Sequence, residues 1–504
     1  MTGPSDGRGR PRGAGRNQQR PGPRRRSLQA PSQRARATDP ARRVAFDVLR
    51  AVSEQDAYAN LVLPPALRRA RLSGRDAGLA TEITYGTLRG RGLYDAILAA
   101  CLDRPLAEVD PPVLDALRMG THQLLATRVP QHAAVDQTVA LVRSVAGQGA
   151  GGFANAVLRR VAEHDPDAWV YRVAPPRDEN LVAHLAVATS HPEWIVRAFR
   201  ESLVAHGRPV DEIDALLAAD NTPPRVALAL LPGLSTLDDV TSAGGDVQPG
   251  RWSPMAAVLA AGEPAGLHVV RVGRARVQDE GSQLAALALA AAPLDGRDAR
   301  WLDLCAGPGG KAALLAAVAA EHDVSLTAVE VSPHRAELVR QALAPVPGSH
   351  EVQVTDGREV GQEEPGSYDR VLVDVPCTGL GALRRRPEAR WRRQPSDLAS
   401  LAPLQRALLS SALDAVRPGG LVAYVTCSPH PAETIAVVTD LARRRDDVHV
   451  LDAVDALEQA AGKTIPDLGT AALPPSGPTG RSAQLWPHLH GTDAMFVALL
   501  RRPA

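Results

Sequence analysis

The sequence predicts a doubly wound, Rossmann-like α/β domain in its C-terminal half, preceded by an all-helical region and a small α+β module. Three observations support this prediction. The apolar run 301–304 leads into a glycine-rich turn and then an alanine- and leucine-rich segment at 311–320, which indicates strand, turn and helix. Two later apolar runs, 371–375 and 421–427, fit further buried strands. Residues 39–164 repeat apolar side chains at helical spacing.

Residues 1–38 are strongly basic. They contain ten arginines against one acid, Asp6, and Pro, Gly, Ser and Gln fill most of the gaps. Such a segment cannot bury enough apolar surface to fold, so we expect a disordered Arg-rich tail. It lacks the apolar core of a signal peptide. A basic arm can add non-specific affinity for phosphates, and a solubilising tail is the alternative.

The composition of the whole chain limits the class of protein. Its 504 residues suggest two to four domains, and the formal net charge is +1. No stretch of the sequence approaches the roughly 20 apolar residues of a membrane span, so we expect a cytoplasmic protein without membrane association. Four cysteines without a C-x-x-C pair indicate neither a disulfide framework nor structural zinc, and we expect no metal.

We expect a helical bundle at 39–165. Its apolar positions include Val44, Val48 and Val52, and helix breaks are expected at 64–65, 73–74, 111–112 and 147–152. Composition gives this bundle no chemistry, and a plain scaffold is one interpretation. Residues 175–275 carry strand-and-turn signals of a small α+β module, which by itself indicates no function. The α/β domain is expected at 276–504.

The glycine turn at 307–310 indicates a ligand site beyond the end of a strand. A phosphate-binding Walker loop is disfavoured, because Cys305 and Ala312 occupy positions where that motif needs Gly and Ser or Thr. The dinucleotide pattern also fits poorly. Glu330 ends the next strand and can bond a ribose, and Asp356 follows a third strand. An adenosine ligand without pyrophosphate therefore fits, with S-adenosylmethionine first; a turn that merely packs is the alternative.

Two cysteines follow apolar strands. One strand ends in Asp374 and leads to Cys377, and the other delivers Cys427 to its carboxyl end. Because the carboxyl ends of parallel strands share one edge, both thiols should face the same crevice as the glycine turn. The alternative is two buried cysteines in adjacent loops. Cys101 and Cys305 are expected to be small packing residues.

The motifs at 305–311 (CAGPGGK), 374–377 (DVPC) and 426–428 (TCS) resemble, in order, three signature motifs of the Sun-type RNA (cytosine-5) methyltransferases. The phrases at 42–45, 76–80 and 155–159 resemble a NusB-type helical RNA-binding domain. Together the two resemblances cover nearly the whole chain. Glu330 departs from the family pattern, in which aspartate is common.

The resemblance implies a class I methyltransferase fold and a covalent mechanism. Cys427 is then the nucleophile that adds to carbon 6 of cytosine, and Cys377 assists product release. DNA cytosine-5 methyltransferases use a Pro-Cys cysteine as nucleophile, so position alone leaves these roles open. The residues expected at the S-adenosylmethionine site are Cys305, Ala306, Gly307, Pro308, Gly309, Gly310, Lys311, Glu330, Asp356 and Asp374.

The partner that the resemblance implies is RNA, with 16S rRNA first and a monomeric enzyme favoured. The basic run Arg384–Arg393 can neutralise phosphates while Trp391 stacks on an unpaired base; a solvated surface loop is the alternative. Transfer RNA and large-subunit rRNA are alternative substrates. A non-catalytic ribosome assembly factor and a small-molecule methyltransferase are rival functions, although a binding protein needs neither Cys377 nor Cys427.

Overall fold

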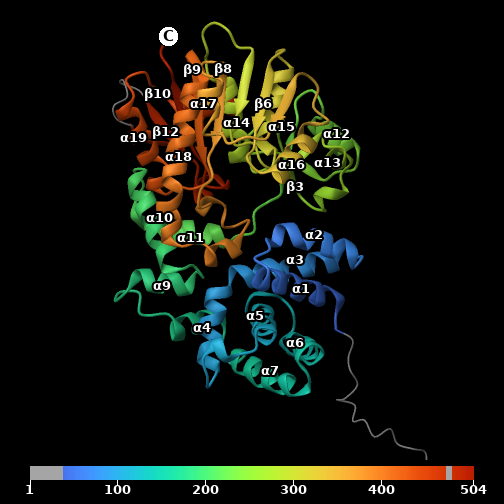
Figure 1. Ribbon diagram of the computed structural model, residues 1–504. Coiled ribbons are helices and arrows are strands. Elements are labelled where there is room, and N and C mark those ends of the chain that lie inside the picture. Colours follow the sequence, from blue (N-terminus) through green and yellow to red (C-terminus); the bar gives the residue numbers. More distant parts are fainter. Residues whose placement is uncertain (1–37, 473–479) are drawn as a thin grey trace, which may run out of the picture. The chain divides into compact units, whose positions relative to one another are not determined.

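The computed structural model describes residues 38–472 and 480–504 of the chain. The expected Arg-rich tail lies outside the described residues, apart from Thr38. Residues 38–504 belong to one unit, and the domain boundaries expected within it remain predictions. Figure 1 shows its N-terminal helices in blue, a middle region in green and a large sheet in yellow to red.

The N-terminal helices are amphipathic and surround one apolar core. In α1 the side chains of Val44, Val48 and Val52, four residues apart, are all buried. The all-helical fold expected here is confirmed. The helices are α1 (Pro40–Glu54), α2 (Ala59–Arg69), α3 (Gly74–Arg89), α4 (Arg91–Cys101), α5 (Pro111–Ala126), α6 (Gln131–Ala146) and α7 (Gln148–Val161).

One of the expected helix breaks, at 64–65, is wrong. Helix α2 continues through Pro64 and Pro65, although an interior proline costs a helix about 3 kcal/mol. Burial of Leu63 and Leu67 in the helical core offsets this cost. The break expected at 147–152 occurs at Gly147, which separates α6 from α7, and α7 then continues through the glycines of 149–152. The breaks at 73–74 and 111–112 are confirmed, because α3 begins at Gly74 and α5 at Pro111.

The middle region has a helical part followed by a small sheet. Its helices are α8 (Pro166–Val173), α9 (Leu181–Ala188), α10 (Glu193–Ala205) and α11 (Ile213–Asn221). An antiparallel sheet follows in the order β2-β3-β1-β4, with its own apolar core. Its elements are β1 (Ala227–Leu230), α12 (Leu237–Ser242), β2 (Val247–Pro249), β3 (Ala256–Leu259), α13 (His268–Arg271) and β4 (Ala275–Val277).

The large sheet has the order β11-β12-β13-β9-β8-β5-β6-β7, and β10 pairs with β13. The five strands β5 to β9 are parallel, and β13 runs antiparallel to β9. The strands are β5 (Arg300–Asp303), β6 (Ser325–Val329), β7 (His350–Gln353), β8 (Tyr368–Asp374), β9 (Val416–Thr426), β10 (His449–Leu451), β11 (Gly469–Ala472), β12 (Arg481–Gln484) and β13 (Phe496–Arg501).

Helices cover both faces of this sheet, so successive strand residues enter two separate cores. Val371 and Val373 belong to one core, whereas Leu372 belongs to the other. In Figure 1, α18 and α19 lie on one side of the strands and α14 and α15 on the other. The predicted doubly wound α/β fold is confirmed. The helices are α14 (Glu280–Ala291), α15 (Gly310–Ala320), α16 (Pro333–Leu343), α17 (Val360–Glu363), α18 (Pro395–Ala415), α19 (Ile435–Arg444), α20 (Ala453–Ala461) and α21 (Pro487–His490).

Across residues 38–472 and 480–504, the helices are too short or too polar to cross a lipid bilayer.

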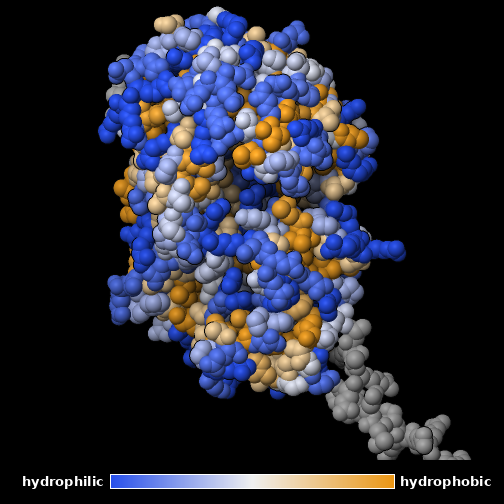
Figure 2. Space-filling view, viewed as in Figure 1, coloured by the Kyte–Doolittle hydropathy of each residue, from blue (hydrophilic) through white to orange (hydrophobic). Residues whose placement is uncertain are grey.

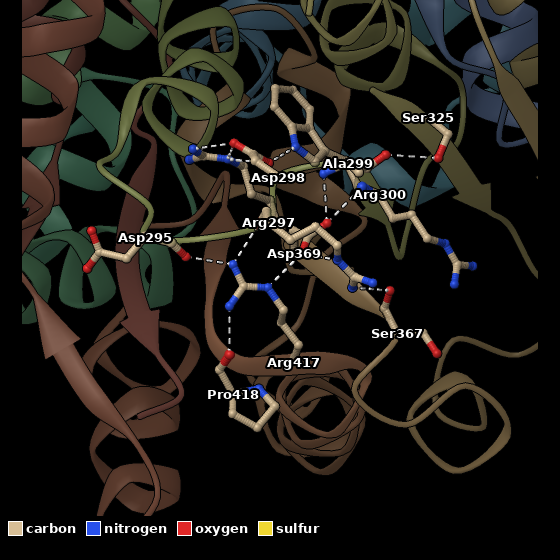
Figure 3. Close-up of polar contacts among 12 residues, drawn as sticks. Asp295, Arg297, Asp298, Ala299, Arg300, Ser325, Ser367, Asp369, Arg417 and Pro418 are labelled. Atoms are coloured by element: carbon tan, nitrogen blue, oxygen red, sulfur yellow. Dashed lines mark hydrogen bonds and ion pairs between the residues drawn. The ribbon is translucent and has the colours of Figure 1, made fainter. Parts of the chain in front are cut away.

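A buried carboxylate joins the starts of three neighbouring strands. Asp369 of β8 accepts hydrogen bonds from the backbone N–H groups of Ala299 (2.8 Å) and Arg300 (2.9 Å), where β5 begins. It also accepts from Nε of Arg297 (3.0 Å) and of Arg417 in β9 (2.6 Å), as the dashed lines in Figure 3 show. Burial opposes ionisation, but these four donors outweigh it and hold the pKa of Asp369 below its ordinary value.

We expect Asp369→Ala to destabilise the fold by about 3–5 kcal/mol, because it leaves two buried donors of the strands and two arginines without their acceptor. Urea unfolding of full-length protein measures the loss. Asp103→Ala is the matched control, because the side chain of Asp103 is 92% exposed, and it should change stability by less than about 0.5 kcal/mol.

The same variant should show a defined pH dependence. Since the pKa of Asp369 is depressed, its contribution is complete above the ordinary value of 3.8 and is lost as the pH falls below it. The stability gap between wild type and Asp369→Ala should therefore be constant from pH 5 to 8. A gap that narrows within this range would contradict an ionised, fully bonded carboxylate.

Candidate active site

The glycine turn after β5 needs its glycines for space as much as for conformation. Gly309, at the start of α15, has a φ of +100°, and a Cβ there would lie 2.5 Å from Cβ of Ala342. A Cβ at Gly307 would lie 2.1 Å from Oε2 of Glu330. The turn therefore lies directly against the end of β6, as the strand–turn–helix prediction requires.

Glu330 follows β6 and is almost completely buried. Its Oε1 accepts the backbone N–H of Ser332 at 2.9 Å, and its Oε2 lies 3.4 Å from the guanidinium of Arg335. Arg335 in turn donates to the carbonyl of Gly307 at 2.6 Å. These contacts fix the carboxylate beside the glycine turn, where the sequence predicted it.

Asp356 lies in the loop after β7. It accepts hydrogen bonds from the backbone N–H of Arg358 and from its Nε, each at 3.0 Å. The side-chain bond from Arg358 is the main reason that the pKa of Asp356 is lowered. Asp356 and Glu330 line the same pocket of about 520 Å³, together with the glycine turn and both cysteines.

The two thiols converge as predicted. Strands β8 and β9 are parallel, with Asp374 opposite Val425, so the loops that follow them emerge side by side. Sγ of Cys377 lies 3.3 Å from Sγ of Cys427, within hydrogen-bonding distance. Beside them, Nζ of Lys311 donates to Asp374 at 2.7 Å.

The electrostatics of the pair differ between the two sulfurs. The hydrogen bond from Cys377 lowers the pKa of Cys427, with a further contribution from Lys311, although burial and Asp374 oppose ionisation. The same hydrogen bond and burial raise the pKa of Cys377 well above its usual value. These shifts favour Cys427 over Cys377 as the thiolate of the pair.

Cys305 and Asp303 lie near the thiol pair, and burial raises the pKa of both. Burial is the main reason that the pKa of Cys305 is raised well above its usual range, so this thiol stays neutral. Burial, with the charge of Asp374 adding to it, raises the pKa of Asp303 to about 7. Cys305 lines the site but is not the activated thiol.

A glutamate that the sequence analysis missed holds the Cys377 loop. Glu433 is buried, and its carboxylate accepts from the backbone N–H of Thr378 at 2.8 Å and from its hydroxyl at 2.5 Å. Gln405 of α18 donates both to Glu433, at 3.2 Å, and to the carbonyl of Pro376, at 3.0 Å. No local pattern marks Glu433, because its partners lie 28 to 55 residues earlier in the chain.

A second pocket of about 590 Å³ adjoins the first one. The two share the glycine turn, Asp374 and Cys427, whereas Lys311 lines only the second and Glu330 and Asp356 only the first. Cys427 thus lines both of the adjoining pockets. The face shown in Figure 2 is hollowed above α2 and α3, and both hydrophilic and hydrophobic residues border the hollow.

The expectation that the run Arg384–Arg393 binds phosphates is wrong for its buried members. Arg384 and Arg385 form ion pairs with Asp279 and Asp493; Nε of Arg384 lies 3.2 Å and Nε of Arg385 2.9 Å from Asp493. Arg390 is fully buried, and its guanidinium donates to Asn221 at 2.8 Å. These charges are neutralised or solvated by the protein itself.

The remainder of the run docks against the N-terminal helices. Arg392 donates to the carbonyls of Val52 (2.9 Å) and Ala57 (2.7 Å). The ring of Trp391 packs closely against Gly92, where an added Cβ would lie 2.6 Å from the ring. The ring is therefore not a free stacking surface. Arg386 is the exposed exception, with its guanidinium 5.5 Å from the ring of Tyr58.

Comparisons with known proteins identify two families along the chain. Residues 288–501 match the family model described as 16S rRNA methyltransferase RsmB/F, and residues 39–163 match the NusB family. The chain belongs to the RsmB/F methyltransferase family. The NusB-type resemblance of the helical region and the Sun-type resemblance of the motifs are confirmed by these matches.

The relatives match over nearly their whole length. A Mycobacterium tuberculosis protein named as a methyltransferase, Rv1407, is 52% identical over 93% of this chain and 98% of its own. Ribosomal RNA small subunit methyltransferase B of Pseudomonas syringae pv. tomato is 31% identical over 91% and 96%. The crystal structure of PH0851 shares the fold, with a TM-score of 0.72 at 20% identity over 92% of this chain and 98% of that one.

We expect Cys377→Ala to raise the pKa of Cys427, because the substitution removes the hydrogen bond that stabilises its thiolate. The pH profile of Cys427 alkylation by iodoacetamide, followed by peptide mass spectrometry, should shift to higher pH. Cys101→Ala is the control, because Cys101 is buried in the helical core and should leave the profile unchanged. An unshifted profile in Cys377→Ala would show that the two thiols are not coupled.

Proposed function

We propose that the protein transfers a methyl group from S-adenosylmethionine to carbon 5 of a cytosine in 16S rRNA, through a covalent bond between Cys427 and carbon 6. The observation that carries this proposal is the pair of thiols, 3.3 Å apart, that lines one pocket together with the glycine turn. Cys427 lines both adjoining pockets, which suits a nucleophile that acts on one ligand beside another.

The pocket beside the glycine turn fits S-adenosylmethionine. Gly307 leaves room that a side chain would fill, and the buried carboxylate of Glu330 is placed to accept hydrogen bonds from ribose hydroxyls. Asp356 and the turn residues 305–310 line the remainder of the 520 Å³ pocket, which lies in the usual size range for a small ligand. When bound, S-adenosylmethionine supplies an electrophilic methyl group.

Cytosine needs covalent activation because its carbon 5 is a poor nucleophile. Attack by the Cys427 thiolate on carbon 6 forms a C–S bond and makes carbon 5 enamine-like, so that carbon 5 can take the methyl group. A base then removes the carbon-5 proton. The electron pair of the broken C–H bond forms the double bond between carbons 5 and 6 and expels the Cys427 sulfur from carbon 6. The neutral thiol of Cys377, 3.3 Å from Cys427, is placed to donate a proton to the departing thiolate.

RNA is the substrate class that the relatives support. The Pseudomonas syringae relative is named for the small-subunit ribosomal RNA, and this chain covers 96% of its length. The NusB-family match at 39–163 supports the same assignment, since it supplies a helical domain in front of the catalytic one. We therefore propose 16S rRNA before tRNA or large-subunit rRNA.

We expect Cys377→Ala, incubated with unmodified 16S rRNA and S-adenosylmethionine, to accumulate a protein–RNA band on a denaturing gel. The adduct forms through Cys427, but its release is impaired. Cys427→Ala and the double variant should form no band and transfer no methyl group, while their affinity for S-adenosylmethionine stays within about twofold of wild type.

The same gel separates the alternatives. If wild type methylates 16S rRNA but Cys427→Ala retains normal turnover, the nucleophile assignment fails. If wild type methylates tRNA or 23S rRNA instead, the chemistry stands and the substrate changes. If wild type binds 16S rRNA and methylates none of the three RNAs, the protein is a non-catalytic ribosome assembly factor and not an enzyme.

We expect Glu330→Ala to raise the Kd for S-adenosylmethionine by about 10-fold or more, since it removes a charged acceptor from a buried site. Isothermal titration calorimetry measures this change. Glu337→Ala is the matched control, because Glu337 lies on α16 with its side chain 56% exposed. A Kd for Glu330→Ala equal to that of the control would remove Glu330 from the ribose site.

A further inference from the structure

One wall of the second pocket is formed by the N-terminal helical domain. Thr81, Glu82, Tyr85 and Arg89, spaced along one face of α3 in the N-terminal helical domain, line the same cleft as Lys311, Asp374 and Cys427. Asn60 of α2 joins them. The helical domain therefore contributes side chains to the catalytic cleft itself.

This wall is firmly attached to the loop that carries Cys377. Glu388 accepts the backbone N–H of Ala59 at 3.0 Å, and both groups are buried. Arg390 donates to the carbonyl of Arg89 at 3.3 Å, and Arg392 holds the segment before α2. The position of α3 relative to the two thiols is thus fixed by hydrogen bonds on both flanks of the cleft.

Tyr85 offers an aromatic surface at this wall. Its ring packs on the apolar core of the helical domain and also lines the cleft, so the domain core supports it on one side. Burial, with the nearby charge of Glu388, raises the pKa of Tyr85 to about 12, so the phenol stays neutral at physiological pH. A supported neutral ring is the kind of surface on which an unpaired base stacks.

The cleft also holds two cations, Arg89 and Arg386, that form no ion pair within 4.0 Å in the described part of the chain, although the charge of Glu82 acts on Arg89 and that of Glu388 on Arg386. Nε of Arg89 is buried and has no hydrogen-bond acceptor, and the guanidinium of Arg386 lies 5.5 Å from the ring of Tyr58. The carboxylates opposite are already engaged. Asp374 is paired with Lys311, and Asp279 and Asp493 are paired with Arg384 and Arg385.

Two further acids complete the charge of this cleft. Glu82 is exposed on α3, with its carboxylate 3.5 Å from the ring of His122. Burial holds the pKa of Asp303 at about 7. Arg89 and Arg386 are thus the cations of the cleft whose guanidinium groups remain available to a phosphate.

From these contacts we infer that α3 binds the RNA strand beside the target, with Tyr85 stacking on a nucleotide next to the reacting cytosine and Arg89 contacting a phosphate. This inference rests on the proposed function, since it assumes that RNA enters the second pocket. It makes the helical domain a determinant of substrate selection within the catalytic cleft. Aromatic stacking and cationic phosphate contacts are the usual means of holding unpaired RNA.

The test compares full-length wild type with Tyr85→Ala, Tyr85→Phe and Tyr171→Ala by transfer of tritiated methyl groups to unmodified 16S rRNA. We expect Tyr85→Ala to lower kcat/KM by about 5- to 100-fold, mainly through KM, because one base loses its stacking partner. Tyr85→Phe keeps the ring and should stay within about twofold. Tyr171, which is 89% exposed on α8 and lies outside the cleft, is the matched control.

Arg89→Gln supplies an independent readout that a folding defect would not produce. Loss of one phosphate contact should reduce the slope of log kcat/KM against log salt by about 0.7, whereas Arg89→Lys should retain the slope. Tyr85→Ala should leave the slope unchanged. For every variant, affinity for S-adenosylmethionine should equal that of wild type.

The outcomes distinguish this inference from the proposed function. If wild type methylates 16S rRNA while Tyr85→Ala matches wild type, or while Tyr85→Phe falls as far as Tyr85→Ala, the stacking role is overturned and the proposed function stands. If wild type methylates another RNA instead, the 16S assignment fails and the same variants are compared on that RNA. If wild type methylates no RNA, both proposals fail.

Discussion

The parallel pairing of β8 with β9 is the constraint on which the active site depends. It sets Asp374 opposite Val425, and the two following loops then bring Cys377 and Cys427 within 3.3 Å. A slip of one residue in this register would turn every side chain of β9 to the other face of the sheet and separate the thiols. The two apolar cores on either side of the sheet prevent such a slip, because alternate residues of β8 and β9 are buried in different cores.

The loop after Cys377 extends this constraint to the remainder of the chain. Its arginines satisfy acids of the catalytic domain at one end and backbone carbonyls of the helical domain at the other. Because a buried charge without a partner is costly, this loop and the helical domain stabilise each other's positions. The cleft is consequently built from both domains, and the thiol pair is held at their junction.

Sequence reasoning found the parts of the site that depend on local order. A strand, a glycine turn and a helix are adjacent in the chain, and the crevice rule then places Glu330, Cys377 and Cys427 at the same edge of the sheet. It failed for the arginine run, because charge alone does not reveal acceptors that lie 105 to 340 residues away. Tyr85 and Arg89 gave no signal, since an ordinary amphipathic helix carries such residues on its polar face.

The two ends of the seven-residue strand β8 have different roles. Asp369, near its start, holds three strands together, whereas Asp374, at its end, lies beside the thiol pair. Five residues of extended chain span about 16 Å, a distance at which substitutions usually act independently. The abundance of the folded protein and its catalytic turnover can therefore be tuned separately by substitutions at opposite ends of a single strand. The effects of two such substitutions should be additive.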